Sequence, residues 1–157
     1  GKNMVFDGGG IRGIGSVGNN TLTTSFTRVY FTAAVSVPNT GNFIVWDGTD
    51  DTFTVTTAGY YRVSLDFMTY MPNSASSNER YVAAQLYNST DATQLAIAGT
   101  GIVHSADHST YCSCSFNRIL SLATSKTYEF RAISLDDGTN IGSLNSQTSG
   151  FTIEFVA

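Results

Sequence analysis

The chain has few charged residues and few of the residues that usually carry chemistry. Of its 157 residues 13% are charged, lysine occurs only at Lys2 and Lys126, and there are two prolines, two cysteines and two histidines. The net charge of -4 repels a phosphate backbone, which argues against nucleic acid as a partner. No apolar run approaches the ~18 residues of a membrane-spanning helix, and nothing resembles a signal peptide. We therefore expect neither nucleic-acid binding nor membrane insertion.

The sequence also lacks any window of helical periodicity, and short strand patterns recur with turn signals about every ten residues. The clearest strand covers residues 61–67, where apolar side chains alternate strictly with Arg62, Ser64 and Asp66. We expect Gly59, just before it, to take a positive φ and hinge two strands. The chain closes on the same alternation, with Phe151, Ile153 and Phe155 on one face, which indicates a last strand inside a sheet.

A long strand after F-x-V-x-x-x-G-Y-Y, from Phe53 to Tyr61, and a terminal G-F-x-I-x-F strand at residues 150–155 resemble the heads of complement q-type and tumour necrosis factor-like proteins. The strand order of that family implies further strands over residues 28–34, 43–47, 81–87, 94–98, 113–122 and 127–133, before the last strand at residues 150–156. The resemblance implies an all-β, antiparallel jelly-roll sandwich of about ten short strands that assembles as a homotrimer. The Gly- and Asn-rich residues 1–25 are expected to form a stem or lead-in, and residues 26–157 the head.

One motif suggests an enzyme. Residues 7–13 (DGGGIRG) are similar to the oxyanion-hole loop of patatin-type acyl hydrolases and also satisfy G-x-G-x-x-G. Ser16 follows in I-G-S-V-G, where Ile14 replaces the first glycine of a nucleophile motif, and it follows the loop too soon. No strand-turn-helix context surrounds either motif. We therefore expect no catalytic residues and no enzymatic activity.

Residues of two kinds, histidines and aspartates in acidic turns, are candidates for metal binding. His104 and His108 flank Asp107, and on a trimer axis one histidine from each chain would supply three ligands; solvated loop histidines are the alternative. Asp47, Asp50 and Asp51 surround Gly48, and oxygen-rich loops of this kind can hold calcium, although plain Asp-Gly turns have the same composition. No cofactor is expected beyond such a calcium or other divalent ion. Cys112 and Cys114 share one face of a strand and are expected to be free, buried thiols.

Aromatic residues supply the candidate interaction surfaces. Five tyrosines fall off the predicted apolar faces and are expected to form the subunit interface, as alternating aromatics do in the resembled family: Tyr60, Tyr70, Tyr81, Tyr87 and Tyr111. Isolated tyrosines on a sandwich exterior are the alternative. Trp46, beside the acidic turn, either fills the edge of the core or stacks on a sugar. The predicted ligand-binding residues are Trp46 and the three aspartates of that turn, Asp47, Asp50 and Asp51. The sequons at Asn19 and Asn88 would be glycosylated only in a eukaryotic secretory route.

These features favour a non-enzymatic homotrimeric head of a surface fibre or spike on a phage, virion or bacterial filament, which binds a receptor protein or a glycan on a cell surface. The low lysine content and abundant hydroxyl residues favour such a fibre over an animal plasma protein. The expected location is extracellular or on a virion surface. Two alternatives remain open, a capsid-decorating structural trimer and a monomeric carbohydrate-binding β-sandwich.

Overall fold

The structure, a computed structural model, describes residues 10–14, 22–31, 42–71, 79–103, 110–135, 143–144 and 149–157. Within these ranges the chain is all β and contains no helix, so no helix there could cross a membrane. The strands are β1 (Gly10–Ile14), β2 (Thr27–Arg28), β3 (Ile44–Asp47), β4 (Thr52–Val55), β5 (Gly59–Met71), β6 (Glu79–Asn88), β7 (Thr93–Val103), β8 (Thr110–Leu122), β9 (Tyr128–Leu135), β10 (Ser143–Leu144) and β11 (Gly150–Phe155).

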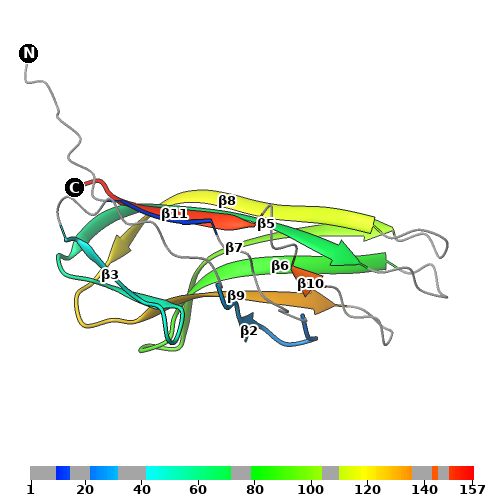
Figure 1. The fold of residues 1–157 in the computed structure, drawn as a ribbon, viewed down its shortest axis with the longest axis horizontal. Helices are drawn as coiled ribbons and strands as arrows, with labels where there is room; N and C mark the ends of the chain where they lie inside the picture. Colours follow the sequence, from blue (N-terminus) through cyan, green and yellow to red (C-terminus); the bar gives the residue numbers. More distant parts are fainter. Residues whose placement is uncertain are drawn as a thin grey trace, which may run out of the picture.

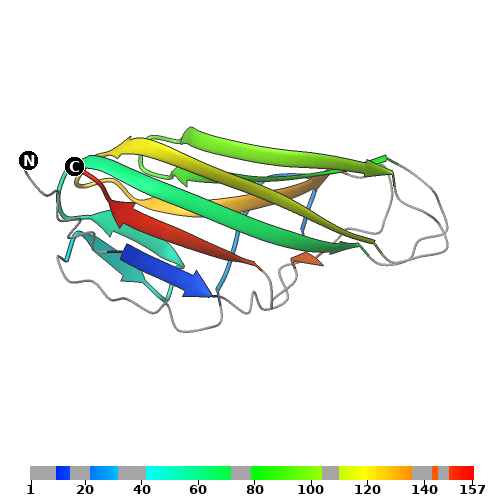
Figure 2. The same ribbon diagram turned by 90° about the horizontal axis from the view of Figure 1, so that it is seen from above.

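The strands form two antiparallel sheets that face each other (Figure 1). In the first, which we call sheet A, β5 pairs with β8 along one edge and with β11 and β10 along the other, and β11 also pairs with β1. In sheet B the order is β3-β4-β9-β6-β7, and β2 pairs with β9. Figure 2 shows β1 and β7 at opposite lateral edges of the sandwich.

The core lies between the sheets, and the alternation predicted from the sequence is confirmed. In β5 the side chains of Tyr61, Val63, Leu65 and Phe67 are buried, and Arg62 and Asp66 are exposed. In β11 Phe151 and Ile153 are buried, and the strand lies between β1 and β5 as expected for a terminal strand inside a sheet. The all-β, antiparallel fold class is therefore confirmed, although β5 and β8 are long, with 13 residues each.

The expectation for Gly59 is wrong, because no described glycine has a positive φ. Gly59 is the first residue of β5, and the bends of the preceding turn fall at Thr56 and Thr57. A Cβ at Gly59 would overlap the backbone carbonyl oxygen of Ala157, which accepts a hydrogen bond of 2.6 Å from the Tyr60 N–H. Gly59 is therefore needed for close approach of two backbones, and not for a turn conformation.

The first strand predicted for the head, residues 28–34, is much shorter in the structure. β2 pairs with β9 only at Thr27 and Arg28, and residues 32–34 lie outside the described residues. Val29 still bonds the Phe130 carbonyl, but the Phe31 N–H bonds the carboxylate of Asp51 at 3.0 Å. The segment leaves the ladder because a side chain replaces the neighbouring strand as its hydrogen-bond acceptor.

Part of the predicted lead-in lies against the head. Gly10–Ile14, the second half of the glycine-rich motif, is the strand β1 and pairs with β11 along its whole length. Leu22 belongs to the buried core cluster. The motif therefore does not form a loop that opens a helix in this part of the chain, and Ser16 lies outside the described residues. A separate stem over residues 1–25 stays a prediction.

The close approach at Gly59 predicts a specific loss of stability. In a Gly59→Ala variant the Cβ meets backbone and the Phe155 ring, which cannot move away cheaply, so unfolding should become easier by about 1–3 kcal/mol. Gly48→Ala is the matched control, because its Cβ would meet only Trp46 side-chain atoms at an ordinary 3.9 Å. Urea denaturation should show a change within about 0.5 kcal/mol for the control. Equal stability of the two variants would contradict the role given to Gly59.

Candidate functional site

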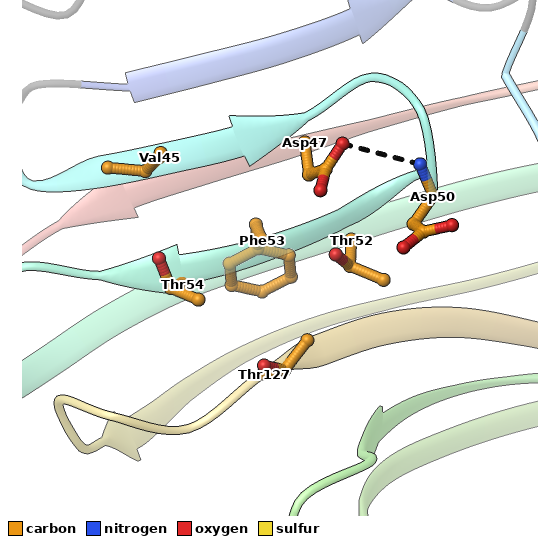
Figure 3. Close-up of a pocket in the computed structure, with 7 residues that line it drawn as sticks. All are labelled: Val45, Asp47, Asp50, Thr52, Phe53, Thr54 and Thr127. Atoms are coloured by element: carbon orange, nitrogen blue, oxygen red, sulfur yellow. Dashed lines mark hydrogen bonds between the residues drawn. The ribbon is translucent and has the colours of Figure 1, made fainter.

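A pocket of about 330 Å³ opens on the outer face of sheet B beside the β3–β4 hairpin. Figure 3 shows its lining, which combines carboxylates, hydroxyls and apolar groups from Val45, Asp47, Asp50, Thr52, Phe53, Thr54 and Thr127. Val45 pairs with Thr54, and Asp47 pairs with Thr52, in the antiparallel ladder of β3 and β4. Period-two alternation therefore places these four side chains on one face, and the β8–β9 connection adds Thr127.

The acidic turn of the hairpin is held by its own side chains. Oδ1 of Asp47 accepts the N–H groups of Thr49 at 2.8 Å and Asp50 at 3.4 Å, and the latter bond is drawn in Figure 3. Asp51 follows with a φ of 52°, in the left-handed region that Asp tolerates better than most residues. The carboxylate of Asp51 points inward to Phe31, whereas Asp47 and Asp50 line the pocket.

Burial is the main influence on the pKa of the Asp51 carboxyl group. Desolvation raises its pKa above the usual 3.8, and the hydrogen bond from Phe31 and the charge of Arg28 oppose that rise. The side chain therefore has a structural function, since its carboxylate satisfies a buried backbone N–H. Of the four predicted ligand-binding residues, Asp47 and Asp50 line the pocket and Asp51 does not.

Trp46 also turns away from the pocket. Its ring stacks on Phe151 with centroids 5.0 Å apart and meets Phe31 edge-on at 5.8 Å. Both contacts belong to the packed edge of the core, so the core-filling alternative describes its position. Nothing in this geometry supports the stacking of a sugar ring on Trp46.

A charge network lies next to the pocket on the same face. Glu129, which is buried, pairs with Nε of Arg28 at 2.6 Å and with Nε of Arg131 at 2.5 Å. Arg28 also donates to the Asp50 carbonyl, and the Arg131 guanidinium lies 3.6 Å from the centre of the Tyr87 ring. Thr52 and Tyr87 flank Glu129 across the strands. The sequence analysis missed this network, because only the pairing of β2, β4, β6 and β9 brings its members together.

The five predicted interface tyrosines divide between the two sheets. Tyr60, Tyr70 and Tyr111 lie on the outer face of β5 and β8, which we call the β5–β8 face, and Tyr70 and Tyr111 pair with ring centroids 5.3 Å apart. Tyr60 is 57% exposed and Tyr111 55%, and Ile119 on the same face is 55% exposed. Tyr81 and Tyr87 lie instead on β6 in sheet B.

Tyr81 and Ile97 form a second exposed apolar surface, which we call the β6–β7 face. Each is 41% exposed, and the Tyr81 ring lies directly over Gly99, where any Cβ would overlap it. Tyr87 is half-buried by its contact with Arg131. An interface role for all five tyrosines stays a prediction. In the structure they lie on two separate surfaces, so the predicted interface would involve both.

Several other predicted residues can now be placed. Cys112 and Cys114 are free and buried, as expected, and burial raises the pKa of the Cys114 thiol to about 12. Asn88 is buried, and its amide donates to and accepts from Asp91, so the sequon there forms a turn in the folded chain. His104, His108 and Asn19 lie outside the described residues. Among the residues that are described, no group of three or more His, Cys, Asp or Glu could hold a metal ion. Metal binding stays a prediction.

Comparison with known proteins supports the fold. No family model and no curated protein matches the sequence. Among solved structures, Eiger TNF from S. frugiperda is similar with a TM-score of 0.58 and 14% identity over 96% of this chain and 92% of that one. Murine APRIL at pH 8.0 has a TM-score of 0.59 and 11% identity, and at pH 5.0 a TM-score of 0.57 and 9% identity, each over 95% of this chain and 99% of that one. The chain therefore has a tumour necrosis factor-like jelly-roll fold.

The position of Asp51 generates a prediction with a defined pH dependence. Asp51→Asn keeps an oxygen that accepts the Phe31 N–H, tolerates the positive φ and removes a buried charge. Because the folded pKa is raised, ionised Asp51 lowers stability above that pKa, and this cost disappears as the pH falls through it toward 3.8. Asp51→Asn should therefore be at least as stable as wild type at neutral pH, and should lose this gain on acidification.

Asp51→Ala is the contrasting variant. It leaves the Phe31 N–H without its acceptor and should cost about 1–3 kcal/mol at neutral pH, and more as the pH falls toward 3.8, because only the wild type is then relieved of a buried charge. Urea midpoints between about pH 4 and 8 measure both effects. If Asp51→Asn lost as much stability as Asp51→Ala at neutral pH, the charge and its attraction to Arg28 would hold the turn, and the hydrogen bond would not.

Proposed function

We propose that the chain is a non-enzymatic, homotrimeric head domain that binds a receptor or a surface glycan at the end of a fibre or spike. The extracellular or virion-surface location and the phage or bacterial origin belong to the same proposal. The fold supports it in general terms, since the solved structures it resembles are tumour necrosis factor-type proteins. Trimerisation would multiply a weak single contact by avidity.

The main support for a trimer is that the chain exposes two different apolar surfaces. A closed ring of three chains needs a heterologous interface, in which one surface of each chain meets a different surface of the next. The β5–β8 face and the β6–β7 face supply two such surfaces on different sheets. A symmetric dimer would require only one self-complementary surface.

A capsid-decorating trimer would use the same two surfaces, so the assembly test applies to both roles. The alternative of a monomeric carbohydrate-binding sandwich included a sugar stacked on Trp46. The Trp46 ring packs against Phe31 and Phe151 instead. The pocket beside the β3–β4 hairpin remains as a ligand site in either assembly state.

The heterologous interface can be tested by two single variants and their mixture. Tyr111→Glu places a charge on the β5–β8 face, and Ile97→Glu places one on the β6–β7 face. Burying an unpaired charge is costly, so light scattering should show the wild type at the mass of three chains and each variant at the mass of one. In the mixture, one intact contact forms between the two kinds of chain, and a mass of two chains should appear.

Thr124→Glu is the control, since it adds the same charge to an exposed position in the β8–β9 turn, on neither face. It should leave the mass at three chains. A wild-type monomer would refute the trimer. A wild-type trimer that both face variants leave intact would refute this choice of surfaces, and a symmetric dimer would refute the ring.

A further inference from the structure

We infer that the pocket of the β3–β4 hairpin binds one neutral sugar unit of a glycan through hydrogen bonds to its hydroxyl groups. The inference rests on the proposed function and names the ligand class for its glycan-binding part. The pocket is about 330 Å³, near the lower end of the range for small-molecule sites and of a size for a single ring.

The lining matches the chemistry of an uncharged sugar. Asp47 and Asp50 offer carboxylate oxygens, which form short, charge-assisted hydrogen bonds with hydroxyl donors. Thr52, Thr54 and Thr127 can each donate and accept. Thr52 lies on the same outer face as Asp47 but is only 7% exposed, so neighbouring side chains cover most of it. Val45 adds an exposed apolar group that the C–H face of a sugar ring can contact.

Strand pairing and hydrogen bonds fix the hairpin and the Thr127 segment that border the pocket. The β3–β4 ladder fixes Val45 and Thr54, and the turn bonds fix Asp47 relative to Asp50. The Asp50 carbonyl accepts a hydrogen bond of 3.1 Å from Arg28. Opposite the hairpin, the Thr127 N–H bonds Oγ1 of Thr90 at 3.0 Å, and its carbonyl accepts from Ser89 at 2.9 Å. A pre-organised site loses less entropy on binding, which a small, weak ligand requires.

Charge favours a neutral sugar over an acidic one. No arginine or lysine is among the residues that line the pocket, and its two carboxylates repel an anionic group. The guanidinium groups of Arg28 and Arg131, in the adjacent charge network, both pair with Glu129, so their positive charge is partly compensated. A sialic or uronic acid would approach the carboxylates of Asp47 and Asp50, which form no ion pair with an Arg or Lys among the described residues.

The chain contains a reporter for this site. Trp46 is the only tryptophan, and its Cδ1 and Nε1 lie 3.9 Å from the position of a Cβ on Gly48 in the same turn. A sugar that contacts Asp47 and Asp50 should therefore change the tryptophan fluorescence without touching the indole ring.

The experiment titrates the wild-type protein with the methyl glycosides of glucose, galactose, mannose and N-acetylglucosamine, and with N-acetylneuraminic acid. Tryptophan fluorescence and backbone amide chemical shifts are followed up to about 100 mM sugar, and the mass of the same samples is measured. We expect at least one neutral glycoside to bind with a dissociation constant of about 1–10 mM and to shift the amides of the hairpin, and the acid to bind more weakly.

Asp50→Asn replaces a charge-assisted hydrogen bond with a weaker neutral one, and Thr54→Val removes one hydrogen bond. Both preserve side-chain shape, so each should weaken binding about tenfold. Thr152→Val is the matched control, because Thr152 is also a half-buried strand threonine but lies on β11 in sheet A. It should bind like the wild type.

Three outcomes would overturn the inference: no response to any neutral glycoside, equal binding by Asp50→Asn and Thr54→Val, or binding that requires added calcium. The mass measurement separates this inference from the assembly proposal. A trimer that binds no sugar refutes only the pocket, and a monomer that binds sugar through Asp50 and Thr54 refutes only the trimer.

Discussion

The contact between Phe151 of β11 and Phe130 of β9, with ring centroids 4.8 Å apart, joins the two sheets. Phe31 and Trp46 pack on the same Phe151 ring at 4.9 and 5.0 Å, so strands from both sheets and a segment outside the ladders meet at one side chain. Phe31 can reach this position because Asp51 accepts its N–H where the strand pairing stops. The shape of the β3–β4 turn is therefore coupled to the core. The same contacts hold the turn that borders the pocket.

The charge network on sheet B has a related effect. A buried ion pair is weak evidence for stability, because desolvation offsets much of the attraction, but it does restrict which arrangements of the strands are tolerated. A shift of β2 along β9 would separate Arg28 from Glu129 and leave a buried carboxylate with one partner. The network thus fixes the short β2 strand, whose two-residue ladder with β9 is too small to do so alone. It also keeps the Arg28 guanidinium against the Asp50 carbonyl, at the edge of the pocket.

Sequence periodicity identified the fold because each side chain of a half-buried strand reports its own environment. The alternation in β5 and β11 was therefore readable, and so was the burial of Cys114 in β8. Periodicity contains no information about which distant backbone lies next to a residue, so the requirement for Gly59 beside Ala157 could not be found. For the same reason periodicity could not reveal the ion pair between Arg28 and Glu129, which lie 101 positions apart in the sequence. In the acidic turn, composition gave three aspartates without showing which one points inward.

The order of strands in sheet B determines whether trimer assembly and sugar binding in the pocket are compatible. The pocket lies on β3 and β4, and the β6–β7 face lies at the other edge of the sheet, with β9 between them. In Figure 2, β7 forms one lateral edge of the molecule, and the β3–β4 hairpin lies toward the opposite edge. A ring of chains that buries the β6–β7 face against the β5–β8 face of a neighbour would therefore not need to cover the pocket. Each trimer would present three pockets, and a surface with repeated sugar units could engage more than one of them, so that millimolar contacts combine into useful avidity.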